Sequence, residues 1–121
     1  MDTMDITELQ KETLASVNEY LTNLIPAMNK VIIELSGNEK EDTWEYLRMI
    51  IDGLNWVIEA YNGTSSYINK DSSKIDSAVV DASVKKLSLA YRNKDNGALS
   101  SVLAEDIIPF LTTLKSITEA I

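Results

Sequence analysis

The chain contains no histidine and no cysteine among its 121 residues. These two absences exclude disulfide bonds, the Ser-His and Cys-His nucleophile pairs, and the usual zinc and haem ligands. They also remove the commonest general base at neutral pH and the Glu-x-x-His motif of di-iron carboxylate bundles. We therefore expect a protein that is not an enzyme and that holds no metal and no cofactor.

Glycine and proline are scarce, with four and two residues respectively. The glycines stand far apart, so the chain lacks the glycine-rich loops that bind nucleotide phosphates and the turn that exposes a hydrolase serine. Long apolar runs are absent too, since a spanning helix needs ~20 such residues. The acidic first residues do not resemble a secretory signal. We expect a soluble, cytoplasmic protein that binds no membrane.

Acidic residues outnumber basic ones by 19 to 11, which gives a net charge of −8. Residues 1–62 hold twelve Asp and Glu against four Lys and Arg, whereas residues 63–121 hold seven of each. We expect no nucleic-acid binding, because affinity for phosphates comes from cationic side chains. The acidity is explained either by solubility or by steering toward a basic partner.

The first predicted helix starts near Asp5, which forms a capping-box-like pair with Glu8. Gly37 suits the left-handed position after the end of this helix. Pro26 lies inside the pattern, so we expect a kink there, because proline removes a backbone donor and clashes with the preceding turn. Apolar residues alternate at spacings of three and four: Leu14, Val17, Leu21, Leu24, Met28, Val31 and Leu35.

The second predicted helix covers residues 43–62, with Asn38/Glu41 and Asp42/Glu45 as competing caps. A polar segment, residues 63–72, reads as the one long loop. The apolar seam of this helix consists of Trp44, Leu47, Ile51, Leu54, Ile58 and Tyr61, widened by Ile50 and Val57.

A second apolar stripe lies on the other side of the same helix: Met49, Gly53, Trp56 and Ala60, at i, i+4, i+7 and i+11. A helix that is apolar on two sides needs two neighbours. Gly53 costs a helix interior roughly 1 kcal/mol relative to Ala, and its retention suits the close approach of another backbone or a large ring. Tryptophan is enriched at the centres of interfaces. We predict that these four residues bind a partner.

Three explanations of this stripe remain open. It can be covered within the monomer, by the loop with Tyr67 and Ile68 or because the helix is central. It can form a homodimer, or it can bind a different protein. Beside it, Glu45, Asp52 and Glu59 follow one another at spacings of seven and are interpreted as a solvated, partly paired face rather than a catalytic site.

The third helix is predicted to begin at a Ser73/Asp76 cap and to end near Asn93, with an apolar seam of Val80, Val84, Leu87 and Tyr91. It is the basic helix, interpreted as a solvated face that complements the acidic first half. A turn over residues 94–97 leads to the fourth helix, which Pro109 interrupts. Its seam is Leu103, Ile107, Phe110, Leu114, Ile117 and Ile121, flanked by Leu99, Ile108 and Leu111.

Four amphipathic helices with mostly short links predict an all-α protein of one domain, residues 1–121. The arrangement that fits best is an antiparallel up-down four-helix bundle with Pro-kinked first and last helices.

The segment Ala90-Tyr91-Arg92-Asn93-Lys94-Asp95, followed by Leu99, Leu103, Glu105, Asp106, Ile107, Ile108, Pro109 and Leu111, resembles the end of small helical proteins of motile Gram-positive bacteria. These are regarded as akin to flagellar export chaperones, bundles that clasp an amphipathic segment of a client protein. The resemblance implies a binding protein without catalysis.

The leading hypothesis is a non-enzymatic helical protein-interaction module, chaperone-like, adaptor-like or self-associating, that uses the second stripe. One alternative is a small-ligand-binding bundle or enzyme with a pocket near the Pro26 and Pro109 kinks, lined in part by Tyr20. Another is an acidic inhibitor or immunity-type protein that binds a basic target.

Overall fold

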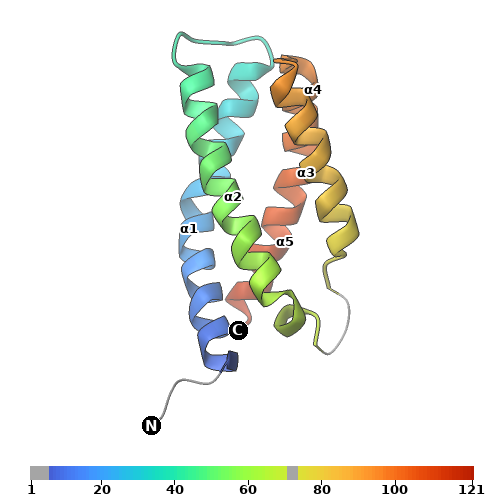
Figure 1. Ribbon diagram of the computed structural model, residues 1–121. Coiled ribbons are helices and arrows are strands. Elements are labelled where there is room, and N and C mark those ends of the chain that lie inside the picture. The colour runs from blue at the N-terminus through green and yellow to red at the C-terminus, as the bar shows by residue number, and fades with distance from the viewer. Residues whose placement is uncertain (1–5, 71–73) are drawn as a thin grey trace.

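The computed structural model describes residues 6–70 and 74–121. These residues form four antiparallel helical rods and no strand, which confirms the all-α four-helix bundle (Figure 1). The start of α1 and the end of α5 lie at the same end of the bundle. The elements are α1 (Ile6–Leu35), α2 (Thr43–Ile68), α3 (Ser77–Arg92), and a last rod made of α4 (Asn96–Val102), the π-helical turn η1 (Leu103–Ile107) and α5 (Ile108–Glu119).

The first helix follows its sequence pattern closely, and all seven residues of its predicted seam are buried in the core. Pro26 is exposed, and α1 continues through it without a break. The predicted Asp5 cap lies outside the described residues. Gly37 ends the helix with φ +118°, the left-handed conformation predicted for it.

A buried hydrogen-bonded corner joins α1 to α2. The hydroxyl of Thr43 donates to Oε1 of Glu34 at 2.7 Å and accepts the backbone N–H of Lys40 at 2.7 Å. Thr43 and Glu34 are both buried. Asp42 is the N-cap residue of α2, as one of the two competing predictions had it, but its side chain makes no capping hydrogen bond. The alternative cap at Asn38 is wrong.

The second helix is longer than predicted, because it runs through Gly63 and the serines to Ile68. Thr64 and Ile68 are buried, and the hydroxyl of Thr64 donates to the carbonyl of Ala60 at 2.7 Å. Burial of these side chains outweighs the weak helix propensity of the segment. The long loop predicted for residues 63–72 is therefore wrong over its first six residues.

The third helix begins at Ser77, with Asp76 as its N-cap; the Asp76 carboxylate accepts the N–H of Ala78 at 2.9 Å. The sequence had predicted a cap formed by Ser73 together with Asp76, whereas Asp76 is itself the N-cap residue. Ser73 lies outside the described residues. Tyr61 of α2 is buried, and its hydroxyl lies 2.8 Å from that of Ser77. This contact ties the end of α2 to the start of α3.

The turn before the last rod is shorter than predicted. Lys94 adopts φ +50°, and Asp95 caps α4 by accepting the N–H of Ala98 at 3.0 Å. Gly97 consequently lies in the first turn of the helix rather than in the connection.

The π-helical turn η1 ends two residues before Pro109, the second residue of α5, and explains the predicted interruption. A proline lacks the N–H that would continue the helical ladder, and a π-turn accommodates one extra residue. The buried seam is displaced as a result, so that the predicted Phe110 and Ile117 are only half-buried and Ile121 is exposed. Its buried members are Leu99, Val102, Leu103, Ile107, Leu111, Leu114 and Thr118.

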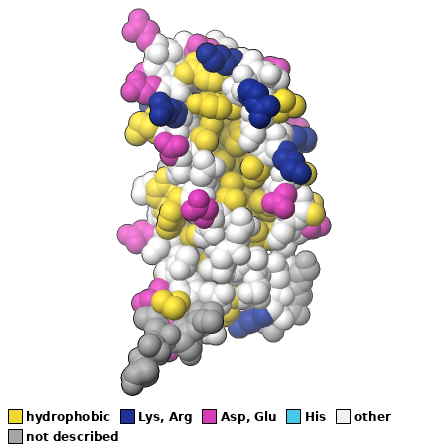
Figure 2. All heavy atoms as spheres, viewed as in Figure 1, with side chains coloured by type: hydrophobic (Ala, Val, Ile, Leu, Met, Phe, Trp, Pro, Cys, Tyr) yellow, Lys and Arg dark blue, Asp and Glu magenta, His cyan; other side chains and the backbone are white. Residues whose placement is uncertain are grey.

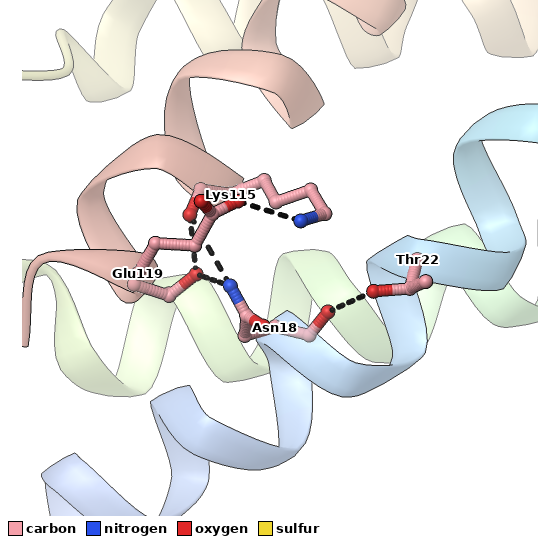
Figure 3. Close-up of polar contacts among 5 residues, drawn as sticks. Asn18, Thr22, Lys115 and Glu119 are labelled. Atoms are coloured by element: carbon pink, nitrogen blue, oxygen red, sulfur yellow. Dashed lines mark hydrogen bonds and ion pairs between the residues drawn. The ribbon is translucent and has the colours of Figure 1, made fainter.

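The helices are not equally close on all sides of the bundle. α1 packs closely against α2 and α5, whereas α2 and α3 bring few backbone positions together. Asn18 of α1 donates from Nδ2 to the hydroxyl of Thr118 at 2.9 Å and to the carbonyl of Lys115 at 3.3 Å (Figure 3). Lys115 forms an ion pair with Glu119 one turn further on, at 2.6 Å.

Within the described residues, the continuous helix Asn96–Glu119 is long and apolar enough to cross a membrane, by length and composition alone. In the bundle, the inward seam of this helix lines the core against α1.

Substitution of Gly63 by Ala tests the extension of α2. Gly63 is exposed, and a Cβ there meets nothing within 4 Å. Because Ala is the better helix former, we expect Gly63→Ala to raise the free energy of unfolding by about 0.5–1 kcal/mol, measured by urea denaturation. Gly37→Ala is the matched control and should lower it, since residue 37 has φ +118°. A loss of stability in Gly63→Ala would contradict a helical residue 63.

Candidate functional site

The predicted partner-binding stripe of α2 faces outward beside α1. Met49 is 66% exposed and Trp56 is 42% exposed, whereas Gly53 and Ala60 are half-buried. The segment proposed to cover the stripe, around Tyr67 and Ile68, belongs to α2 itself. The two large side chains of the stripe therefore remain open to solvent in the monomer.

Gly53 lies directly beneath the ring of Tyr20 from α1. A Cβ at position 53 would overlap the hydroxyl oxygen of Tyr20 and come within 2.9 Å of its Cζ. The large ring that the sequence predicted to approach Gly53 therefore comes from within the chain. Gly53 is required for the packing of α1 on α2, and α1 covers part of the stripe.

The same tyrosine holds Trp56 in place. The rings of Tyr20 and Trp56 meet edge to face, with centroids 5.5 Å apart and planes at 81°. Such aromatic pairs contribute ~0.5–1.5 kcal/mol beyond the apolar area that they bury. Trp56 is thus fixed on one side by Tyr20 and exposed on the other.

The first helix contributes further apolar side chains to this surface. Leu9 and Ala27 lie eleven residues before and seven residues after Tyr20, which places them on the same side of α1. Leu9 is 50% exposed, and Ala27 is half-buried. We call the surface formed by these residues the α1/α2 face: Leu9, Tyr20 and Ala27 of α1 with Met49, Gly53, Trp56 and Ala60 of α2.

Two further contacts fix the register of the helices that carry the α1/α2 face. The side-chain amide of Gln10 donates to the carbonyl of Gly63 at 3.3 Å near one end of the face. The ammonium of Lys30 lies 5.1 Å from the ring centroid of Tyr46 near the other. These contacts hold the α1 and α2 halves of the surface side by side along most of their length.

Acidic side chains border the α1/α2 face on both helices. On α2, Asp52 lies between Met49 and Trp56 in sequence, at i+3 and i−4. On α1, Glu19 precedes Tyr20 on the side away from buried Leu21. We call the exposed charged residues along the two outer edges the rim: Glu12, Glu19 and Lys30 of α1 with Glu45, Arg48, Asp52 and Glu59 of α2.

The rim acids have no ion-pair partners within residues 6–70 and 74–121. The two ion pairs present there, Lys86–Asp106 and Lys115–Glu119, both lie in the second half of the chain. The predicted compensation of the acidic first half by the basic third helix is therefore not made through ion pairs. Figure 2 shows the consequence: Lys and Arg gather over its upper part, while Asp and Glu recur down the edge along α1 and α2.

Figure 2 also shows a strip of hydrophobic side chains between α2 and α3. It belongs to a shallow cleft of about 110 Å³ at the place where these helices bring few backbone positions together. Leu54 and Leu87 are buried in its floor. The wall residues Ile51, Ile58 and Val84 are half-buried. Each of them is therefore less exposed than Met49 or Trp56.

Two larger clefts border α3 and the last rod. One, of about 390 Å³, lies beside α4, and the other, of about 310 Å³, includes Pro109; Glu105 and Asp106 of η1 line both. Tyr20, which the sequence proposed as a pocket residue, lines neither. No group of three or more acidic residues suited to a metal ion occurs in the described part of the chain.

Comparison with known families gives a match over most of the chain. Residues 12–117 match the family model described as "Domain of unknown function (DUF8042)", so the chain belongs to this family. No curated protein and no solved structure matches the chain.

Substitution of Gly53 by Ala tests the contact between α1 and α2. Although Ala is the better helix former, its Cβ would displace the Tyr20 ring, so we expect a loss of about 1–3 kcal/mol in the free energy of unfolding. In a Tyr20→Ala background, the same change should become stabilising by roughly 1 kcal/mol. Urea denaturation of the four proteins measures both effects. Equal effects of Gly53→Ala in the two backgrounds would contradict the contact.

Proposed function

We propose that this member of the DUF8042 family is a non-enzymatic helical protein-interaction module. It associates through the α1/α2 face with an apolar helix, from another protein or from a second copy of the chain. The observation that carries the proposal is the exposure of Met49 and Trp56, at 66% and 42%, on a pair of closely packed helices.

Exposed apolar side chains are common singly, but a continuous group marks an interaction surface. Leu9, Met49 and Trp56 are three of the large exposed hydrophobic residues of the chain, and the ring of Tyr20 packs against that of Trp56. Full burial of a large apolar side chain contributes ~1.5–3 kcal/mol. A helix that covers this group therefore gains enough apolar burial for specific association.

The side chains of the chain favour binding over catalysis. Histidine and cysteine are absent, so a catalytic site would depend on carboxylates and hydroxyls. The carboxylates nearest to the α1/α2 face are solvent-exposed. The likeness of residues 90–111 to flagellar export chaperones implies the same class of function and stays a prediction.

Trp56→Glu tests the proposed surface. We expect it to abolish association while far-UV circular dichroism keeps the helical signal, because the core residues of α2 are unchanged. Leu89→Glu is the matched control, since Leu89 is 56% exposed on α3, away from the face. Sedimentation velocity and pull-down with purified partner would measure the loss. If both variants associate equally, the α1/α2 face is not the association surface.

A second candidate function is the binding of a small ligand in the clefts beside η1, because two cavities of about 390 and 310 Å³ meet there. A ligand at a hundred times its dissociation constant adds ~2.7 kcal/mol to the free energy of unfolding. A thermal-shift screen with metabolites should therefore raise the melting temperature of the wild type but not of Ser101→Trp, which fills the larger cleft. If no compound shifts the wild type, this candidate is rejected.

A further inference from the structure

We infer that the occupant of the α1/α2 face is a basic amphipathic helix of another protein, with Lys or Arg on both sides of its apolar seam. This inference rests on the proposed function and adds the chemistry of the partner. It follows from the rim, in which five carboxylates and two cations border the exposed apolar residues.

The rim holds five carboxylates and two cations, all exposed. Of the cations, Lys30 lies over the ring of Tyr46 and is already engaged within the chain. On α2, Arg48 is the one cation of the rim beside three carboxylates, Glu45, Asp52 and Glu59. It forms no ion pair with any of them. Carboxylates therefore outnumber cations on both edges of the face, by two to one on α1 and three to one on α2.

A second copy of the chain fits this rim poorly. In a two-fold symmetric dimer through the α1/α2 face, the same patch meets itself, so the carboxylates of one rim would face those of the other. Like charges opposed across an interface cost several kcal/mol. A helix with basic flanks instead places its cations over both rows of carboxylates.

The dimensions of the surface set the length of the occupant. Met49 and Ala60 are eleven residues apart on α2, which corresponds to ~16 Å of helix axis. An occupant of three to four turns covers this distance with apolar side chains at i, i+3 or i+4, and i+7. In this arrangement the seam of the occupant lies over Tyr20, Trp56 and Met49.

Two synthetic 18-residue helical peptides with the same leucine seam test the inference, one flanked by lysine and the other by glutamate. Fluorescence anisotropy measures their dissociation constants for four proteins: the wild type, Trp56→Glu, the rim variant Glu19→Lys/Asp52→Lys, and the control Asp81→Lys/Glu105→Lys. The control makes the same change in net charge, with exposed acids of α3 and η1.

We expect the wild type to bind the lysine peptide at least tenfold more tightly than the glutamate peptide. Trp56→Glu and the rim variant should each weaken binding of the lysine peptide tenfold or more, and the rim variant should gain affinity for the glutamate peptide. The control should stay within twofold of the wild type. Added salt should weaken the wild-type complex, because exposed charges are screened.

The possible failures separate the two proposals. If both peptides bind equally and Trp56→Glu abolishes both, the face is correct and the basic chemistry is wrong. If the wild type is a dimer that Trp56→Glu dissociates, the occupant is a second copy and the inference is overturned. If the lysine peptide binds Trp56→Glu as tightly as the wild type, the inference and the proposed function both fail.

Discussion

The close packing of α1 on α2 is the contact on which the rest of the structure depends. Tyr20 fills the space above Gly53 and holds the edge of Trp56, so one ring determines both how near the helices approach and how the indole is presented. A residue larger than glycine at position 53 would displace the ring of Tyr20. The apolar surface that we assign to binding is therefore a product of the core contact beneath it.

The sequence predicted the helices well wherever the apolar period was strong. The seam of α1 is buried throughout, and Gly37 ends the helix as expected. The prediction failed where local propensity and tertiary packing disagree. Residues 63–66 are weak helix formers, but Thr64 and Ile68 are buried, and this burial could not be read from the segment alone. At η1 the extra residue of the π-turn moved the buried seam by one position.

The candidate site was half predictable. Spacing along α2 was enough to group Met49, Gly53, Trp56 and Ala60. The contribution of α1 to the site could not be predicted in this way. It depends on the register between two helices, and the spacing of apolar residues within one helix does not determine that register. A tyrosine at the edge of a helix seam gives no sign that it will meet a glycine more than thirty residues later. The sequence showed the excess of acidic residues in the first half of the chain. That no basic side chain of the second half forms an ion pair with the rim acids could be seen only from the positions of the cations.

The buried corner between Glu34 and Thr43 has a consequence for recognition. Because a hydrogen bond of 2.7 Å between two buried side chains links the end of α1 to the start of α2, these helices are constrained to move together. A helix that binds the proposed α1/α2 face would meet a template whose shape is set in advance, so the entropy cost of ordering would fall mainly on that helix. Such a template favours segments that are already helical before they arrive.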